Sequence, residues 1–359
     1  MRKNSPGGAV IAATTAAVLV SAGYSATAAA DESTTFSGKA FIDLTDYTLK
    51  NDDVNSANNG FGLDVKRFYL GVTHSFDDTW SANLTTDFNY VGNDGETNLF
   101  VKKAYVQARL SDAFVARAGS ADLPWVPFVE DQYGYRFVEN VIVDRLKFGT
   151  SADWGIHAGG KAAEGRFNYA ASVINGAGYK NPTRSNSVDF EGRVGFAPIK
   201  GLTFAIGGYS GKLGKDIEGS ATPPRHTAER FDALVSWVNG PLRAGAEYFQ
   251  AKDWLQVTTV ASDKADGFSV WGSYDFNTMW GAFARYDNAD PSKDLNPDLK
   301  DEYMNLGVVA HARKGIDVAF VYKHEKVDGG GTVGTSNGNI GGLNEGKYDE
   351  VGLWAQVAF

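Results

Sequence analysis

The sequence contains no cysteine among its 359 residues. Disulfide frameworks, thiolate metal sites and cysteine nucleophiles are therefore excluded. After residue 30 the chain also lacks any run of about 20 apolar residues, which is the length that a membrane-spanning helix requires. This absence excludes a polytopic helical membrane protein.

Residues that carry catalysis are scarce as well. The five histidines are scattered, and none has the His-x-His or His-Glu-x-x-His spacing of a zinc site. The glycine-rich tract 329–342 lacks the Gly-Lys-Ser/Thr ending of a phosphate-binding loop. We expect no enzymatic activity, no cofactor and no metal.

Glycine and aromatic residues are abundant instead. The chain has 42 glycines and only 10 prolines, and 13% of its residues are aromatic. Such a composition excludes a disordered or collagen-like chain. Acidic residues outnumber basic ones, 43 to 34, which disfavours nucleic acid as a partner.

The two ends of the chain carry export signals. Residues 1–30 have a basic start, an apolar middle and an Ala-rich end before Asp31, which predicts a signal peptide cleaved after Ala30. A single anchoring helix is the alternative. At the other end, residues 351–359 alternate between an apolar and a more polar face and finish on Phe359, which resembles the assembly signal of bacterial outer-membrane barrels.

Between these ends nearly every segment alternates with period two, which predicts an all-β chain over residues 31–359. We expect sixteen strands. They lie near 36–47, 61–76, 79–91, 98–110, 113–119, 153–163, 166–175, 188–198, 202–212, 227–239, 241–252, 266–277, 279–288, 301–313, 316–327 and 346–359.

The gaps between these strands alternate strictly between long and short. Short connections carry turn residues, as in Asn239-Gly240-Pro241 and Lys314-Gly315, whereas loops such as 179–187 and 328–345 are long. A meander with long loops at one end and short turns at the other is typical of a transmembrane antiparallel β-barrel. A soluble β-sandwich would need neither an even strand count nor one-sided loops.

The two faces of each predicted strand differ in polarity. Lipid-compatible residues share one parity, for example Phe204 with Ile206 and Phe231 with Val235. The other parity holds the charges, and a barrel of sixteen strands is too wide for side chains to fill. The sequence therefore predicts a water-filled lumen.

One loop breaks the pattern of the others. The third long connection, residues 120–152, is rich in aromatic and apolar side chains and is too long for a bare connection. We expect it to fold into the barrel as a constriction loop; the alternative is an outward loop packed on itself or on a neighbouring subunit.

Charges on this loop and on the wall are the candidate site. Arginine suits carboxylates and phosphates through its forked donors, and pore charges set a barrier for one ion sign. The candidate pore-lining and anion-binding residues are Arg117, Arg136, Arg109, Arg67, Arg145, Lys147 and Arg193. Acids with inward parity oppose them, namely Asp43, Asp87, Asp153, Glu191, Asp232, Glu247, Asp275 and Glu350.

Several segments resemble one known family. These segments are Ala104–Leu110, Arg117-Ala118-Gly119, Pro124, Phe128, Arg136-Phe137-Val138-Glu139 and Val173–Gly178. Together they resemble the phosphate-selective porin O and P family over residues 36–200, although Ser120, Ala121 and Asp122 stand where its members often carry a lysine. The resemblance implies a trimeric porin in the outer membrane of a Gram-negative bacterium that passes anions such as phosphate, with Arg117 and Arg136 at matching positions.

Two other functions stay open at this point. Aromatic residues with inward parity favour a general or carbohydrate-preferring diffusion porin; they are Tyr69, Tyr105, Trp271, Phe283 and Tyr303. A loop that fills the lumen would instead make a plugged, non-conducting structural or receptor barrel. The expected partners are outer-membrane lipid, small anionic or neutral solutes and further copies of the chain.

Overall fold

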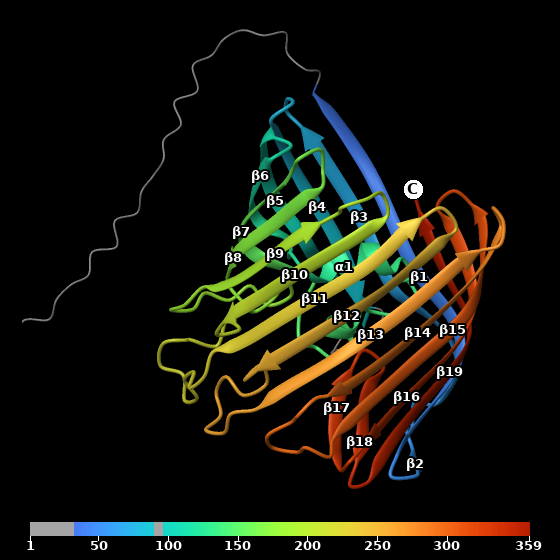
Figure 1. The fold of residues 1–359 in the computed structure, drawn as a ribbon. Helices are drawn as coiled ribbons and strands as arrows, with labels where there is room; N and C mark the ends of the chain where they lie inside the picture. Colours follow the sequence, from blue (N-terminus) through green and yellow to red (C-terminus); the bar gives the residue numbers. More distant parts are fainter. Residues whose placement is uncertain (1–31, 90–95) are drawn as a thin grey trace, which may run out of the picture.

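The computed structural model describes residues 32–89 and 96–359. In this part of the chain, sixteen long antiparallel strands form one closed barrel (Figure 1). They are β1 (Ser33–Asn51), β3 (Gly60–Ser75), β4 (Trp80–Asn89), β5 (Asn98–Ser111), β6 (Phe114–Asp122), β7 (Ala152–Ala162), β8 (Phe167–Ile174), β9 (Asp189–Phe196), β10 (Leu202–Gly211), β11 (Ala228–Asn239), β12 (Leu242–Lys252), β13 (Lys264–Asp275), β14 (Trp280–Asp290), β15 (Lys300–Arg313), β16 (Ile316–Asp328) and β19 (Glu345–Ala358). The predicted all-β barrel is confirmed.

The barrel closes between the first and last strands. β1 pairs with β3 on one side and with β19 on the other, and Lys39 lies opposite Ala358 in the second pair. Beyond the ladder, Gly38 and Phe359 exchange two backbone hydrogen bonds of 3.0 Å each. The terminal phenylalanine therefore takes part in the seam.

Short turns gather at one end of the barrel and long loops at the other (Figure 1). The first described residues and the C-terminus lie at the short-turn end. At the loop end, the two-residue strand β2 (Val54–Asn55) pairs with β1, and β17 (Gly331–Thr335) pairs with β18 (Gly338–Gly342) in the last loop. The predicted signal peptide, residues 1–30, lies outside the described residues.

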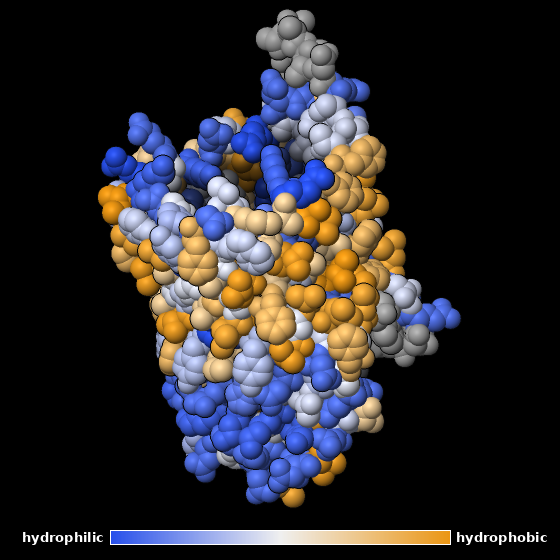
Figure 2. Space-filling view, turned by 90° about the vertical axis from the view of Figure 1, so that its right-hand side faces the viewer, coloured by the Kyte–Doolittle hydropathy of each residue, from blue (hydrophilic) through white to orange (hydrophobic). Residues whose placement is uncertain are grey.

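On the face drawn in Figure 2, an apolar belt crosses the middle of the barrel between two polar ends. Its residues have the outward parity that the sequence indicates, and each leaves more than a third of its surface exposed; examples are Phe68, Leu70, Phe204, Ile206, Phe231, Val235, Leu306, Phe320 and Leu353. Within the described residues, no helix is long and apolar enough to cross a membrane.

Four register shifts interrupt the ladders of the described strands, and two of them, one on β3 and one on β5, each add a lysine. The β1–β3 register shifts between Phe41 and Ile42, so that Lys66 has no opposite residue. The β4–β5 register shifts between Thr85 and Thr86 and leaves Lys102 unmatched in the same way. Because a bulge adds one residue to one strand, consecutive side chains there can point to the same side.

Candidate functional site: the cavity beside an inward-folded loop

The third long loop, residues 123–151, folds into the barrel (Figure 1). It contains the helices α1 (Val126–Tyr133) and α2 (Ile142–Arg145), which the sequence pattern does not predict. The predicted loop began at residue 120, whereas β6 continues to Asp122. The inward fold buries the apolar residues of the loop, because Val126, Val129 and Ile142 keep no exposed surface.

Trp125 fixes the start of the loop to the wall. Its backbone N–H donates a 2.9 Å hydrogen bond to Glu191 Oε1, and its indole Nε1 donates one of 2.8 Å to Glu247 Oε1. The ring lies against Gly207 of β10, where a Cβ atom would come within 2.5 Å of the indole. Gly207 therefore provides the space in which Trp125 packs.

Replacing Gly207 with valine should destabilise the protein by about 1–3 kcal/mol, because overpacking would displace the fully buried Trp125. The free energy of unfolding in detergent measures the change. Gly192→Val is the matched control, since a Cβ atom there meets nothing closer than a backbone oxygen at 3.9 Å. Equal losses in both variants would contradict the assigned role of Gly207.

The end of α2 is held by a buried cluster of charges. Arg145 Nε lies 3.0 Å from Asp287, its Nη2 lies 2.5 Å from Asp301, and its Nη1 also pairs with Glu325. All four side chains have no exposed surface. Since the three acids come from β14, β15 and β16, Arg145 ties the loop to three consecutive strands.

A second contact joins this loop to the last one. Glu139 lies 3.6 Å from Lys323 of β16 and accepts a 2.6 Å hydrogen bond from the Ser336 hydroxyl, beside the β17–β18 hairpin. Burial would raise the pKa of Glu139, but the Lys323 ammonium and the Ser336 hydroxyl outweigh it and hold the pKa at about 2. Glu139 is therefore ionised and binds both neighbours.

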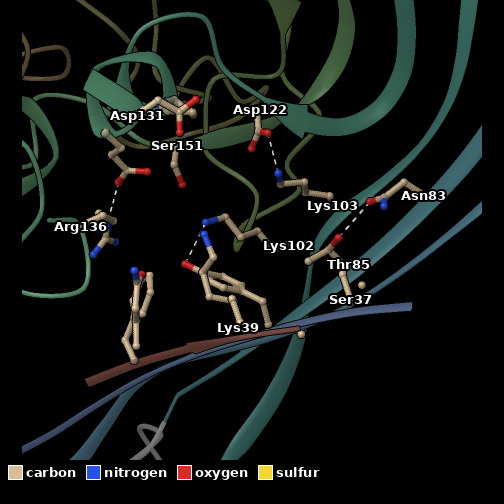
Figure 3. Close-up of a pocket in the computed structure, with 18 of the residues that line it drawn as sticks. Ser37, Lys39, Asn83, Thr85, Lys102, Lys103, Asp122, Asp131, Arg136 and Ser151 are labelled. Carbon is tan, nitrogen blue, oxygen red and sulfur yellow. Dashed lines mark hydrogen bonds and ion pairs between the residues drawn. The ribbon is translucent and has the colours of Figure 1, made fainter. Parts of the chain in front are cut away.

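The opposite half of the lumen keeps an open cavity of about 660 Å³ (Figure 3). Its wall consists mainly of β1, β3, β4 and β5, with further residues from β6 and β19, and the loop forms the facing side. Its charged and aromatic lining residues include Lys39, Phe41, Tyr69, Lys102, Lys103, Tyr105, Asp122, Glu130, Asp131 and Arg136.

Basic side chains in this cavity come mainly from the wall, and acidic ones mainly from the loop. Lys103 lies 2.5 Å from Asp122, and Arg136 pairs with Glu130 and lies 3.8 Å from Asp144. Burial raises the pKa of Asp144, and the Arg136 guanidinium partly offsets this rise.

Burial, together with the charge of Glu130, also raises the pKa of Asp131. An acid with a raised pKa loses its negative charge at a higher pH than the same acid in water, so burial weakens the negative charge that Asp131 presents to the cavity as the pH falls.

The candidate residues from the sequence fall into different places. Arg136 lines the cavity, and Arg67 lies nearby, 3.3 Å from Asp87. Arg117 faces the lumen on β6 and donates to Gln107, while Arg109 lies at the short-turn end with more than half of its side chain exposed.

The remaining candidates belong to the loop and its support. Arg145 is fully buried and therefore does not contact water in the lumen. Arg193 donates to the Pro124 carbonyl and lies over the Phe128 ring at 3.7 Å. Lys147 is exposed at the end of the loop, where its carbonyl accepts a hydrogen bond from Trp254.

Sequence parity missed Lys66 and Lys102, because strict alternation places both toward lipid. The bulges bring them inward, where Lys66 lies 3.2 Å from Asp43 and Lys102 lines the cavity. A signal for this was present, since a lysine facing the middle of a bilayer costs about 2–4 kcal/mol.

Comparison with known proteins agrees with this architecture. The chain is similar in structure to the anion-selective porin from Comamonas acidovorans, with a TM-score of 0.66 and 15% identity over 92% of this chain and 100% of that one. The fold is that of an outer-membrane porin.

Two further solved structures share this porin fold. The outer-membrane channel DcaP of Acinetobacter baumannii has a TM-score of 0.64 and 12% identity, over 94% of this chain and all of that one. The trimer form of OmpT from Vibrio cholerae has a TM-score of 0.59 and 14% identity, over 91% of this chain and 99% of that one. No family model and no curated protein matches the chain in sequence.

Proposed function

We propose that this chain is a porin of the Gram-negative outer membrane through which small hydrophilic anions, phosphate among them, diffuse down their gradients. The observation that carries the proposal is the wall of the cavity, where Lys39 and Lys102 make no ion pair with a carboxylate of residues 32–89 or 96–359. Asp122 and Glu130 are already paired. Uncompensated cations on a pore wall lower the barrier for anions.

Two further features support this assignment. The apolar belt has the composition that lipid contact requires, and a porin of similar fold is described as anion-selective. We propose a homotrimer as well, since OmpT of similar fold has a trimer form. Chemical cross-linking of the detergent-purified protein would yield trimers.

The test is planar-bilayer recording of the protein in a potassium chloride gradient. The reversal potential should have the sign of chloride preference, and added phosphate should reduce the chloride current. A potassium preference would overturn the proposal. A correctly folded barrel that showed no conductance would also overturn it and would favour the plugged, non-conducting barrel.

A carbohydrate-preferring channel is the second candidate, because Phe41, Tyr69 and Tyr105 line the cavity. Trp271 and Phe283, by contrast, pack against Tyr133 and Tyr135 of the loop and offer no free ring to a sugar. Block of the current by maltooligosaccharides, without block by phosphate, would favour this candidate.

A further inference from the structure

Lysines and aromatic rings lie in contact with one another along one side of the lumen. We use the name lysine–aromatic strip for six residues, namely Lys39, Phe41, Tyr69, Lys102, Tyr179 and Phe100. The Lys39 ammonium lies 6.0 Å from the Phe41 ring centre, and Phe41 meets Tyr69 edge-on at 6.1 Å. Four members, from Lys39 to Lys102, line the cavity.

Lys102 lies at the centre of this strip. Its ammonium is 4.6 Å from the ring centre of Tyr69 and 5.6 Å from that of Tyr179. Tyr179 in turn stacks on Phe100 at 6.0 Å, and the Lys180 ammonium lies 4.7 Å from the Phe100 ring centre. The strip therefore continues from the cavity toward the loop end of the barrel.

Lys102 differs from three nearby basic residues in that its ammonium has no carboxylate partner among the described residues. Lys66, Arg67 and Lys103 each pair with an acid, at 3.2, 3.3 and 2.5 Å. Lys102 is only 8% exposed, and the one hydrogen bond of its ammonium to a described residue goes to the Tyr69 hydroxyl at 3.2 Å. An ammonium has three donors, so Lys102 can still donate to a ligand.

The surroundings of Lys102 favour one chemical class of ligand. The Lys102 ammonium offers a charged donor between the rings of Tyr69 and Tyr179, and a carboxylate can accept a charge-assisted hydrogen bond from it. The rings add apolar contact area that inorganic ions cannot use. A flat apolar body joined to one carboxylate uses both features.

We propose that the lysine–aromatic strip binds organic monocarboxylates with a flat apolar body, and that Lys102 holds their carboxylate group. This inference rests on the proposed anion channel and names the class of solute that its wall retains. Neither Lys66 nor Lys103 can substitute for Lys102, because each already has a carboxylate partner.

Block of single-channel chloride current tests this inference, with benzoate, acetate and phosphate as probes. Benzoate should block at a concentration about tenfold below that needed for acetate or phosphate, which corresponds to about 1.4 kcal/mol of ring contact. Lys102→Gln should weaken benzoate block about tenfold through loss of the charged donor. Lys103→Gln, on the same strand and in the same cavity, should change it less than about twofold.

A second variant separates the ring from the charge and does not depend on assembly of the Lys102 variant. Phe41→Leu should weaken benzoate block and leave acetate block unchanged, because only benzoate uses this ring and the Lys102 ammonium contacts Tyr69 and Tyr179 instead. Equal block by benzoate and acetate, tighter block by phosphate, or equal effects of the two lysine variants would each overturn the inference. The proposed anion channel would survive these results, since it fails only if the chloride preference itself is absent.

Discussion

Replacing Arg145 with methionine should lower the free energy of unfolding by about 3–5 kcal/mol, the range found when one partner of a buried ion pair is removed. Three carboxylates with no exposed surface, those of Asp287, Asp301 and Glu325, would lose their shared cation. Chemical denaturation of the detergent-solubilised barrel, followed by tryptophan fluorescence, measures the loss. The third loop should also become accessible to protease.

Arg109→Met is the matched control for this experiment. Arg109 pairs with Asp112 at the exposed short-turn end, where such a pair contributes less than about 1 kcal/mol. If the Arg145 variant proved as stable as the Arg109 variant, the cluster would not anchor the loop. A stable Arg145→Lys variant would show that charge suffices without the forked geometry of the guanidinium.

Replacing Arg136 with glutamine should produce the largest change in ion selectivity. The substitution removes the only basic side chain that the loop presents to the cavity within the described residues, and it leaves Glu130 and Asp144 without their shared partner. A unit charge about 4 Å away contributes about 1 kcal/mol in water, so the ratio of chloride to potassium permeability should fall about fivefold. The reversal potential in a salt gradient gives this ratio directly.

Arg117→Gln tests whether position or total charge decides the result. Arg117 also faces the lumen, but it donates to Gln107 and is not among the residues that line the cavity. Its replacement should shift the reversal potential much less. An equal shift would mean that selectivity is distributed along the lumen, and the role assigned to Arg136 would then be wrong.

The barrel could be predicted because the residue pattern of each strand reflects the lipid on one face and the lumen on the other. A strand between lipid and water alternates residue by residue, as Phe204 and Ile206 do, and turn residues mark where it ends. The inward third loop was predictable for a similar reason, since its aromatic residues are unsuited to a solvated rim.

The contacts of the loop could not be predicted in this way. Arg145 meets acids that lie more than 140 positions later in the chain, and parity shows that these acids face inward without showing what they bind. Bulges were a second obstacle, because one extra residue reverses the expected face of the side chains that lie on one side of it along the strand. Lys102 is the clearest case, since its parity and its polarity disagree.

The off-centre position of the third loop divides the barrel into two parts with separate tasks. Strands β14 to β16 hold the loop through buried ion pairs, and Glu247 of β12 holds it by accepting a hydrogen bond from Trp125. Strands β1, β3, β4 and β5 supply most of the wall of the open cavity. We therefore expect substitutions in the strands that hold the loop to change the stability of the fold. Substitutions in the strands that border the cavity should change which solutes permeate. In the anion channel that we propose, selection can thus retune the range of solutes without weakening the scaffold that holds the loop.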